Sequence, residues 1–164
     1  MGNTLNDAHI ETVKALTAEC VQRLKAGEKV MIAPTGISMI PFIIPRRDKV
    51  ILQPYSVENA LEIGDIAFAH LHDGSYVLHR IVKIKSILNN CNSACCKVYL
   101  MGDGNQRQIE ECTSEDIIGI VSTIIRKGVS VDVNSRGEKF KAKIWMRLRP
   151  IRRYLLFCYR KLHP

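Results

Sequence analysis

The chain has 164 residues, of which 46% are hydrophobic and 24% are charged. This size and composition fit one globular domain with an appendage and exclude a wholly disordered chain. No stretch without charge approaches the roughly 18 apolar residues of a membrane-spanning helix. The first 26 residues also lack the charged-then-apolar order of a secretory signal. We therefore expect a cytoplasmic protein, not an integral membrane or secreted one.

The net charge of +8 is concentrated at one end of the chain. Residues 1–125 contain 12 basic and 14 acidic side chains, whereas residues 126–164 contain 12 basic side chains and only Asp132 and Glu138. This asymmetry predicts an acidic partner for the last quarter, such as an anionic membrane surface or an acidic protein. Nucleic acid is a third, weaker candidate partner, because the tail has no base-reading features.

The cysteines do not form a disulfide or zinc pattern. Cys91, Cys95 and Cys96 lack the paired spacing of a zinc site, and no histidine follows at ligand spacing. We expect reduced thiols, no metal site and no cofactor. The six cysteines are Cys20, Cys91, Cys95, Cys96, Cys112 and Cys158.

Residues 1–28 are predicted to form an amphipathic helix. Asn6 or Asp7 can cap its start, and Gly27 is a natural C-cap. We expect its apolar stripe to pack on the rest of the protein. The stripe consists of Ile10, Val13, Leu16, Cys20, Val21 and Leu24.

Residues 29–134 change to short β-type runs separated by turn residues. The predicted class is mainly β (α+β), with an antiparallel domain of about seven strands. The predicted strands are residues 29–33, 48–52, 65–71, 76–84, 97–101, 116–125 and 129–133.

Residues 135–164 are predicted to form a basic helical tail that Pro150 kinks or splits. Two interpretations of it remain open. In one, the tail lies on an anionic membrane with Trp145, Leu148 and the segment 155–157 inserted. In the other, an apolar stripe covers the β-domain. That stripe consists of Phe140, Ile144, Leu148, Ile151, Leu155, Cys158 and Leu162.

Three polar residues suggest a hydrolytic site. Ser38 follows a strand in a turn rich in glycine and proline, His79 lies in the middle of a strand, and Asp103 lies in a polar turn. Alone, each is more typical of a turn cap, a packed strand histidine or an ordinary turn. Together they supply a nucleophile, a base and an orienting carboxylate.

The motifs around these residues resemble the signal peptidase and LexA-like serine peptidase superfamily over roughly residues 29–126. The whole layout, with a short N-terminal helix and a basic tail, is similar to small soluble members found in gut Bacteroidetes. The motifs are Ser38-Met39-x-Pro41, Asp48-Lys49-Val50, Gly64-Asp65-Ile66, His79-Arg80-Ile81-Val82, Gly102-Asp103-Gly104-Asn105 and Ile118-Gly119-Ile120-Val121.

The resemblance implies a role for each matching residue. Ser38 takes the position of the nucleophile and His79 that of the general base, where many bacterial relatives have lysine. Asp103 matches the aspartate of the Gly-Asp-x-Asn box. In some members the third carboxylate lies further on, so Glu110 or Glu111 is an alternative.

The resemblance also indicates how substrate is held. Gly36 stands where some members carry an oxyanion-binding hydroxyl, so backbone N–H groups, helped by Thr35, would bind the oxyanion, with Met39 beside them. We expect an extended substrate along residues 30–33 and 76–78. Two lysines near these motifs, Lys49 and Lys83, are better interpreted as solvated strand residues than as bases.

These observations predict a serine endopeptidase that cleaves an extended peptide or preprotein segment through a Ser–His(–Asp) site. One alternative is a LexA-like self-cleaving regulator, although the 28 residues before Lys29 are few for a DNA-binding domain. Another is a non-catalytic peptide-binding module. If the tail binds lipid, the protein would lie on the inner face of the cytoplasmic membrane.

Overall fold

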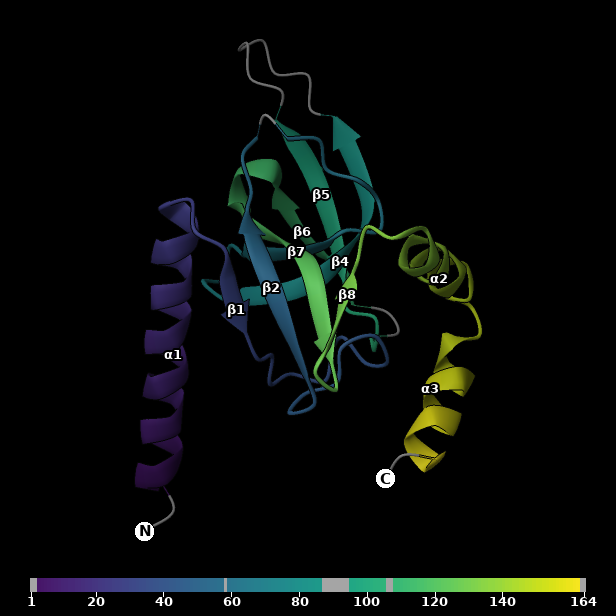
Figure 1. Cartoon of the computed structure of the whole chain (residues 1–164), viewed down its shortest axis with the longest axis horizontal. Helices are drawn as coiled ribbons and strands as arrows, with labels where there is room; N and C mark the ends of the chain where they lie inside the picture. The colour runs from purple at the N-terminus through teal and green to yellow at the C-terminus, as the bar shows by residue number, and fades with distance from the viewer. Residues whose placement is uncertain (1–2, 58, 87–94, 106–107, 163–164) are drawn as a thin grey trace.

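A computed structural model describes residues 3–57, 59–86, 95–105 and 108–162 (Figure 1). The described chain combines an antiparallel sheet with three α-helices, which confirms the α+β class. The elements are α1 (Asn3–Lys25), β1 (Val30–Ile32), β2 (Asp48–Pro54), β3 (Ile66–His70), β4 (Tyr76–Ser86), β5 (Cys96–Met101), β6 (Glu110–Thr113), the 3-10 turn η1 (Ser114–Asp116), β7 (Ile117–Arg126), β8 (Val129–Asp132), α2 (Arg136–Arg147) and α3 (Arg152–Leu162).

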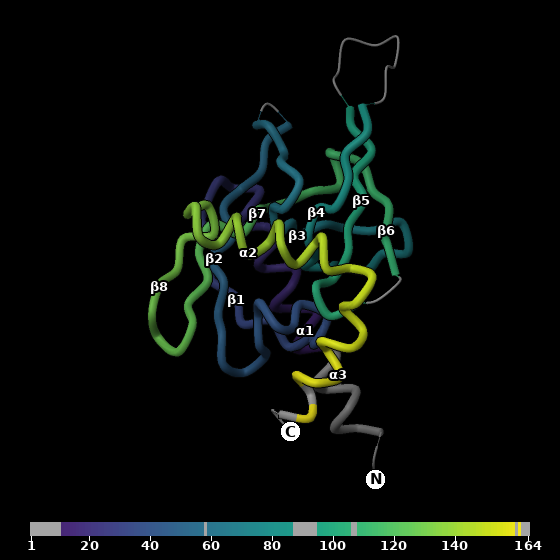
Figure 2. Tube along the Cα trace, turned by 90° about the vertical axis from the view of Figure 1, so that its right-hand side faces the viewer, coloured from purple at the N-terminus to yellow at the C-terminus, as the bar shows by residue number. Residues whose placement is uncertain are grey.

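The sheet has the strand order β1-β2-β7-β3-β4-β5-β6, and every pairing in it is antiparallel. β7 is its central strand. One edge of β7 pairs with β2, while the other edge pairs with β3 near Ile117 and with β8 near Arg126. The β4–β5 hairpin projects beyond the rest of the sheet (Figure 2).

The seven predicted strands are present, with ends that differ by one or two residues. The prediction missed an eighth strand, β6, which pairs with β5 from Lys97–Thr113 to Leu100–Glu110. β6 has only four residues and begins with two glutamates, so it lacks the apolar alternation that signals a half-buried strand.

Helix α1 packs on the sheet only through its C-terminal part. Cys20, Val21 and Leu24 are buried, whereas Val13 is 39% and Leu16 is 61% exposed. The expectation that the whole stripe packs is therefore wrong, because the helix extends past the sheet (Figure 1). The predicted cap at Gly27 is confirmed by its φ of 87°. None of the described helices is long and apolar enough to cross a membrane.

The tail divides into α2 and α3 around Pro150, as predicted. The buried side chains of the two helices are Glu138, Ala142, Arg152 and Leu156. The interpretation in which the predicted apolar stripe covers the β-domain is wrong for much of that stripe, since Phe140 is 63% exposed. The opposite face of α2 packs on the β-domain instead, because polar groups there need partners. Glu138 on that face accepts hydrogen bonds from Arg126 at 2.9 and 3.1 Å.

Glu138 should make the stability of the fold depend on acid pH. The hydrogen bond from Arg126 lowers the pKa of the Glu138 carboxyl, although burial opposes the shift. The stabilisation is present above the ordinary glutamate pKa of about 4.3 and is lost as pH falls through the lower value of the folded protein. Glu138→Gln should lower the free energy of unfolding by about 1–3 kcal/mol at neutral pH, and this difference should shrink in acid.

Urea denaturation of the wild type and of Glu138→Gln, from neutral pH down through the glutamate pKa, measures the difference in unfolding free energy. Glu62→Gln is the matched control, because Glu62 pairs with Lys139 at 2.8 Å but is exposed. Its effect at neutral pH should be smaller. Equal losses for the two variants would contradict the anchoring role of Glu138.

Candidate active site

Ser38 lies in the loop between β1 and β2, and this loop is fixed on both sides of the serine. The N–H of Ile40 donates to the carbonyl of Ile37 at 3.2 Å, and that of Phe42 donates to the carbonyl of Met39 at 2.9 Å. Met39 is 2% exposed and packs in the core. The loop therefore holds the partly exposed Ser38 in a fixed position, not on a free surface turn.

Ser38, His79 and Glu110 form one hydrogen-bonded chain. The Nε2 atom of His79 lies 3.0 Å from the Oγ of Ser38, and its Nδ1 lies 2.7 Å from the Oε2 of Glu110. The His79 and Glu110 side chains are only 8% and 11% exposed. A carboxylate accepts a hydrogen bond from Nδ1–H, which leaves the Nε2 lone pair directed at the hydroxyl. This arrangement can remove the hydroxyl proton as the oxygen attacks an electrophile.

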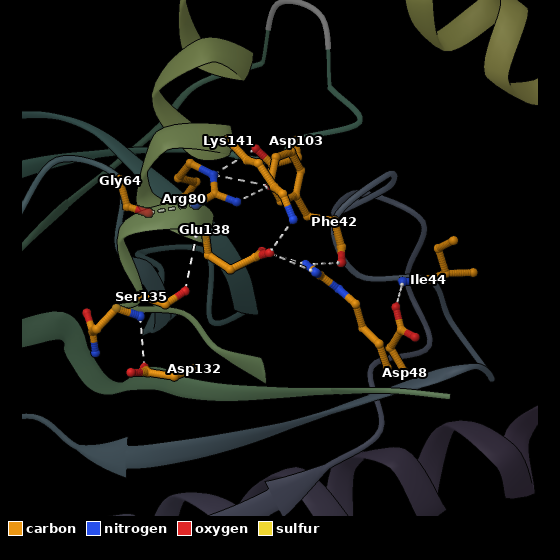
Figure 3. Close-up of polar contacts among 12 residues, drawn as sticks. Phe42, Ile44, Asp48, Gly64, Arg80, Asp103, Asp132, Ser135, Glu138 and Lys141 are labelled. Atoms are coloured by element: carbon orange, nitrogen blue, oxygen red, sulfur yellow. Dashed lines mark hydrogen bonds and ion pairs between the residues drawn. The ribbon is translucent and has the colours of Figure 1, made fainter. Parts of the chain in front are cut away.

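Asp103 has a different partner from the one expected. Its carboxylate accepts hydrogen bonds from Nη2 of Arg80 at 2.6 Å and from Nε at 2.9 and 3.2 Å (Figure 3). The two side chains are 5% and 1% exposed. The Nη1 of Arg80 also donates to the carbonyl of Gly64 at 2.7 Å. The residue beside His79 is thus Glu110, the alternative carboxylate, and Asp103 belongs to a buried ion pair.

The alternation of strand side chains explains this separation. His79 and Arg80 are consecutive in β4, so their side chains leave opposite faces of the sheet. Ile81 shares the face of His79 and lies opposite Leu100, which in turn lies opposite Glu110. Side chains opposite one another share a face, so Glu110 reaches His79 across β5.

The turn that contains Asp103 contacts the loop that carries Ser38. The N–H of Gly104 donates to the carbonyl oxygen of Ser38 at 2.7 Å. A Cβ atom at Gly102 would lie 2.6 Å from that oxygen, closer than side chains normally approach backbone. The indole Nε1 of Trp145 donates to the carbonyl of Asp103 at 3.1 Å, so α2 holds the turn in place.

The expected oxyanion residues have different surroundings. Gly36 and Thr35 are exposed, and a Cβ atom at Gly36 would meet only the Oγ of Ser38, at 4.0 Å. The side chain of Met39 lies in the core, so only its backbone can serve the site. Among hydrogen bonds between described residues, none uses the backbone N–H of Ser38 or Met39 as donor. These two N–H groups are therefore available to an oxyanion.

The other expected residues lie outside this chain of contacts. Glu111 forms an exposed ion pair with Lys97. Lys49 and Lys83 are exposed, and the Nζ of Lys83 lies 5.6 Å from the ring centroid of Tyr99. Cys91 lies outside the described residues. In the described part of the chain, no group of three or more histidines, cysteines or carboxylates is placed to hold a metal ion.

No protein-family model matches the chain, and a search of curated proteins finds no match either. The sequence alone gave no role to Arg80 and did not choose Glu110 over the other carboxylates. It offered Trp145 only as a membrane-inserted residue, whereas its indole donates to the Asp103 carbonyl. A signal for Arg80 was present, because a charged residue next to a half-buried strand histidine must enter the opposite face.

The two carboxylates should differ in their effect on stability. Asp103→Asn leaves the buried Arg80 without a countercharge and should cost about 3–5 kcal/mol of unfolding free energy. Glu110→Gln keeps hydrogen-bonding capacity beside an imidazole that can remain neutral, so its cost should be below about 1.5 kcal/mol. Urea denaturation of both variants measures this. A larger loss for Glu110→Gln would contradict the assignment.

Gly102 should be intolerant of a side chain. Gly102→Ala would push the new methyl against the Ser38 carbonyl and should cost about 1–3 kcal/mol, with shifts of the Ser38 and His79 NMR signals. Gly36→Ala is the matched control, because its methyl has open space, and it should stay within about 0.5 kcal/mol of the wild type. Equal unfolding free energies for the two variants would show that the loop and the turn are not in close contact.

Proposed function

We propose that this protein is a serine endopeptidase of the signal-peptidase-like kind, built on a LexA-like antiparallel β-domain. Ser38 is the nucleophile, His79 the general base and Glu110 the carboxylate that orients it. The observation that carries the proposal is the hydrogen-bonded chain from the Ser38 hydroxyl through His79 to Glu110. In this proposal Asp103 is not catalytic and instead fixes the turn beneath Ser38.

The reaction begins when the Oγ of Ser38 attacks a peptide carbonyl carbon while Nε2 of His79 takes the hydroxyl proton. Glu110 holds the Nδ1–H tautomer and stabilises the imidazolium that forms. The backbone N–H groups of Ser38 and Met39 bind the oxyanion. The C–N bond then breaks, His79 gives its proton to the leaving amine, and water hydrolyses the acyl-enzyme.

Two unpaired strand edges support an extended substrate. In the described sheet β1 pairs only with β2, which leaves its outer edge free. β4 pairs with β5 only from Arg80 onward, so residues 76–78 also have a free edge on that side. Ile32 and Leu78 pack against the same core cluster as Met39. A peptide that adds to these edges would bring its carbonyl close to Ser38.

Labelling with a fluorophosphonate tests the proposal, because the reagent reacts with an activated serine hydroxyl and releases fluoride. The wild-type protein should be labelled on Ser38, and Ser38→Ala should abolish both labelling and cleavage of a peptide library. Ser130→Ala, at an exposed strand serine, is the matched control and should leave both unchanged. A protein that binds peptides but is never labelled would instead be a non-catalytic binding module.

The same assay separates the neighbouring carboxylates. Glu110→Gln should slow both labelling and peptide cleavage by at least about 100-fold, since the imidazole loses the carboxylate that orients it. Glu111→Gln should change neither. Equal effects of the two variants, or none from Glu110→Gln, would leave His79 without its proposed orienting partner.

A further inference from the structure

Helix α3 presents an aromatic face that nothing in the described protein covers. Arg152 and Leu156 are 2% and 1% exposed and attach the helix to the domain. Tyr154 and Phe157 are on the other side and are 62% and 60% exposed. Lys161 is also exposed, and its spacing of four and seven from these two residues places it on the same helix face. We call Tyr154, Phe157 and Lys161, with the neighbouring Arg153, the outer face of α3.

The charges around this face are almost all positive. Of the two acidic residues beyond position 125, Glu138 is buried between Arg126 and Lys141, and Asp132 accepts a hydrogen bond from the N–H of Asn134. Six exposed basic side chains of the tail take part in no ion pair between described residues. These are Arg136, Lys143, Arg147, Arg149, Arg153 and Lys161.

Cations and rings are paired within the outer face itself. The guanidinium carbon of Arg153 lies 5.3 Å from the ring centroid of Tyr154, and the Nζ of Lys161 lies 5.1 Å from that of Phe157. This combination suits the boundary of a bilayer, where aromatic rings lie at headgroup level and basic groups reach the phosphates.

The direction of α3 leaves this face accessible. The helix leads away from the sheet, and its end lies at the end of the molecule where the loop of residues 33–47 is found (Figures 1 and 2). The β4–β5 hairpin projects at the opposite end (Figure 2). A surface that touches α3 can therefore approach the molecule without meeting the hairpin.

We propose that the outer face of α3 docks on an anionic phospholipid surface. Tyr154 and Phe157 would insert at headgroup level, while Arg153 and Lys161 bind phosphates. Lipid is favoured over a second copy of the chain, which would bring the same positive charge to the contact. It is favoured over nucleic acid because aliphatic side chains, Ile151 at 48% and Leu155 at 37%, are exposed beside the rings. This inference goes beyond the proposed function, since it does not depend on Ser38.

Sedimentation of the full-length protein with vesicles tests the inference. Phosphatidylglycerol–phosphatidylcholine vesicles should bind the protein at low salt and release it at high salt, and pure phosphatidylcholine vesicles should bind it weakly. The double variant Arg153→Glu/Lys161→Glu should weaken binding at least about tenfold. Lys83→Glu/Lys85→Glu, which reverses two exposed charges on the far hairpin, should cause a smaller loss.

A second pair of variants tests the aromatic contribution. Phe157→Ser should weaken binding, whereas Leu16→Ser should not, although Leu16 is 61% exposed on α1. α1 carries the exposed Glu11 and Glu19 near this position and should avoid an anionic surface. Circular dichroism confirms that the variants remain folded, and Ser38→Ala should bind vesicles like the wild type.

Four results with vesicles or with the protein alone would overturn the inference. They are absence of binding to anionic vesicles at low salt, equal losses in the two double variants, equal losses in Phe157→Ser and Leu16→Ser, and a dimer that Phe157→Ser dissociates. A fifth result concerns DNA. If the protein binds DNA more tightly than vesicles, and Phe157→Ser leaves the DNA binding unchanged, the inference is overturned and nucleic acid is the partner.

Discussion

The buried ion pair between Arg80 and Asp103 is the contact on which the rest of the site depends. Removing two charges from water costs several kcal/mol for each ion, so the pair is tolerated only because its donors find partners. Arg80 also donates to the carbonyl of Gly64, and its guanidinium carbon lies 4.8 Å from the ring centroid of Phe42. Through these contacts the side chain of Arg80, on strand β4, connects the loop that carries Ser38, the segment before β3 and the turn that contains Asp103.

Arg80 and His79 are neighbours in β4, yet one forms a buried ion pair and the other contacts Ser38. Arg80 keeps its charge at every ordinary pH and suits a permanent buried ion pair. The imidazole ring of His79 has one nitrogen that can accept a proton and one that can donate a hydrogen bond, which a proton-transfer group requires. The pleat of β4 sends them to opposite faces, so Asp103 and Glu110 do not compete for one partner. A strand is well suited to this separation, because adjacent side chains on a helix are not sent to opposite sides.

Much of this arrangement was predictable from the sequence. The alternation and turn residues located seven strands, the turn chemistry singled out Ser38, and the strand pattern placed His79 in the middle of a strand. Glu110 could not be chosen, because β6 is too short and polar to be recognised without its pairing to β5. The buried face of α2 was mispredicted for a related reason: periodicity selects the more apolar face, but the surface beneath α2 offers Arg126 and the Asp103 carbonyl, which need polar partners.

The hydrogen bond from Trp145 to the carbonyl of Asp103 has a consequence for biosynthesis. A chain emerges from the ribosome N-terminus first, so Ser38 and His79 are available well before Trp145. Arg152, which donates to the Trp145 carbonyl at 3.0 Å, emerges later still. The contact of the indole with the turn next to Ser38 can therefore form only after α2 has been synthesised. Until then the loop that carries Ser38 and the turn that contains Asp103 lack the contact with the indole, although Ser38 and His79 have both been synthesised.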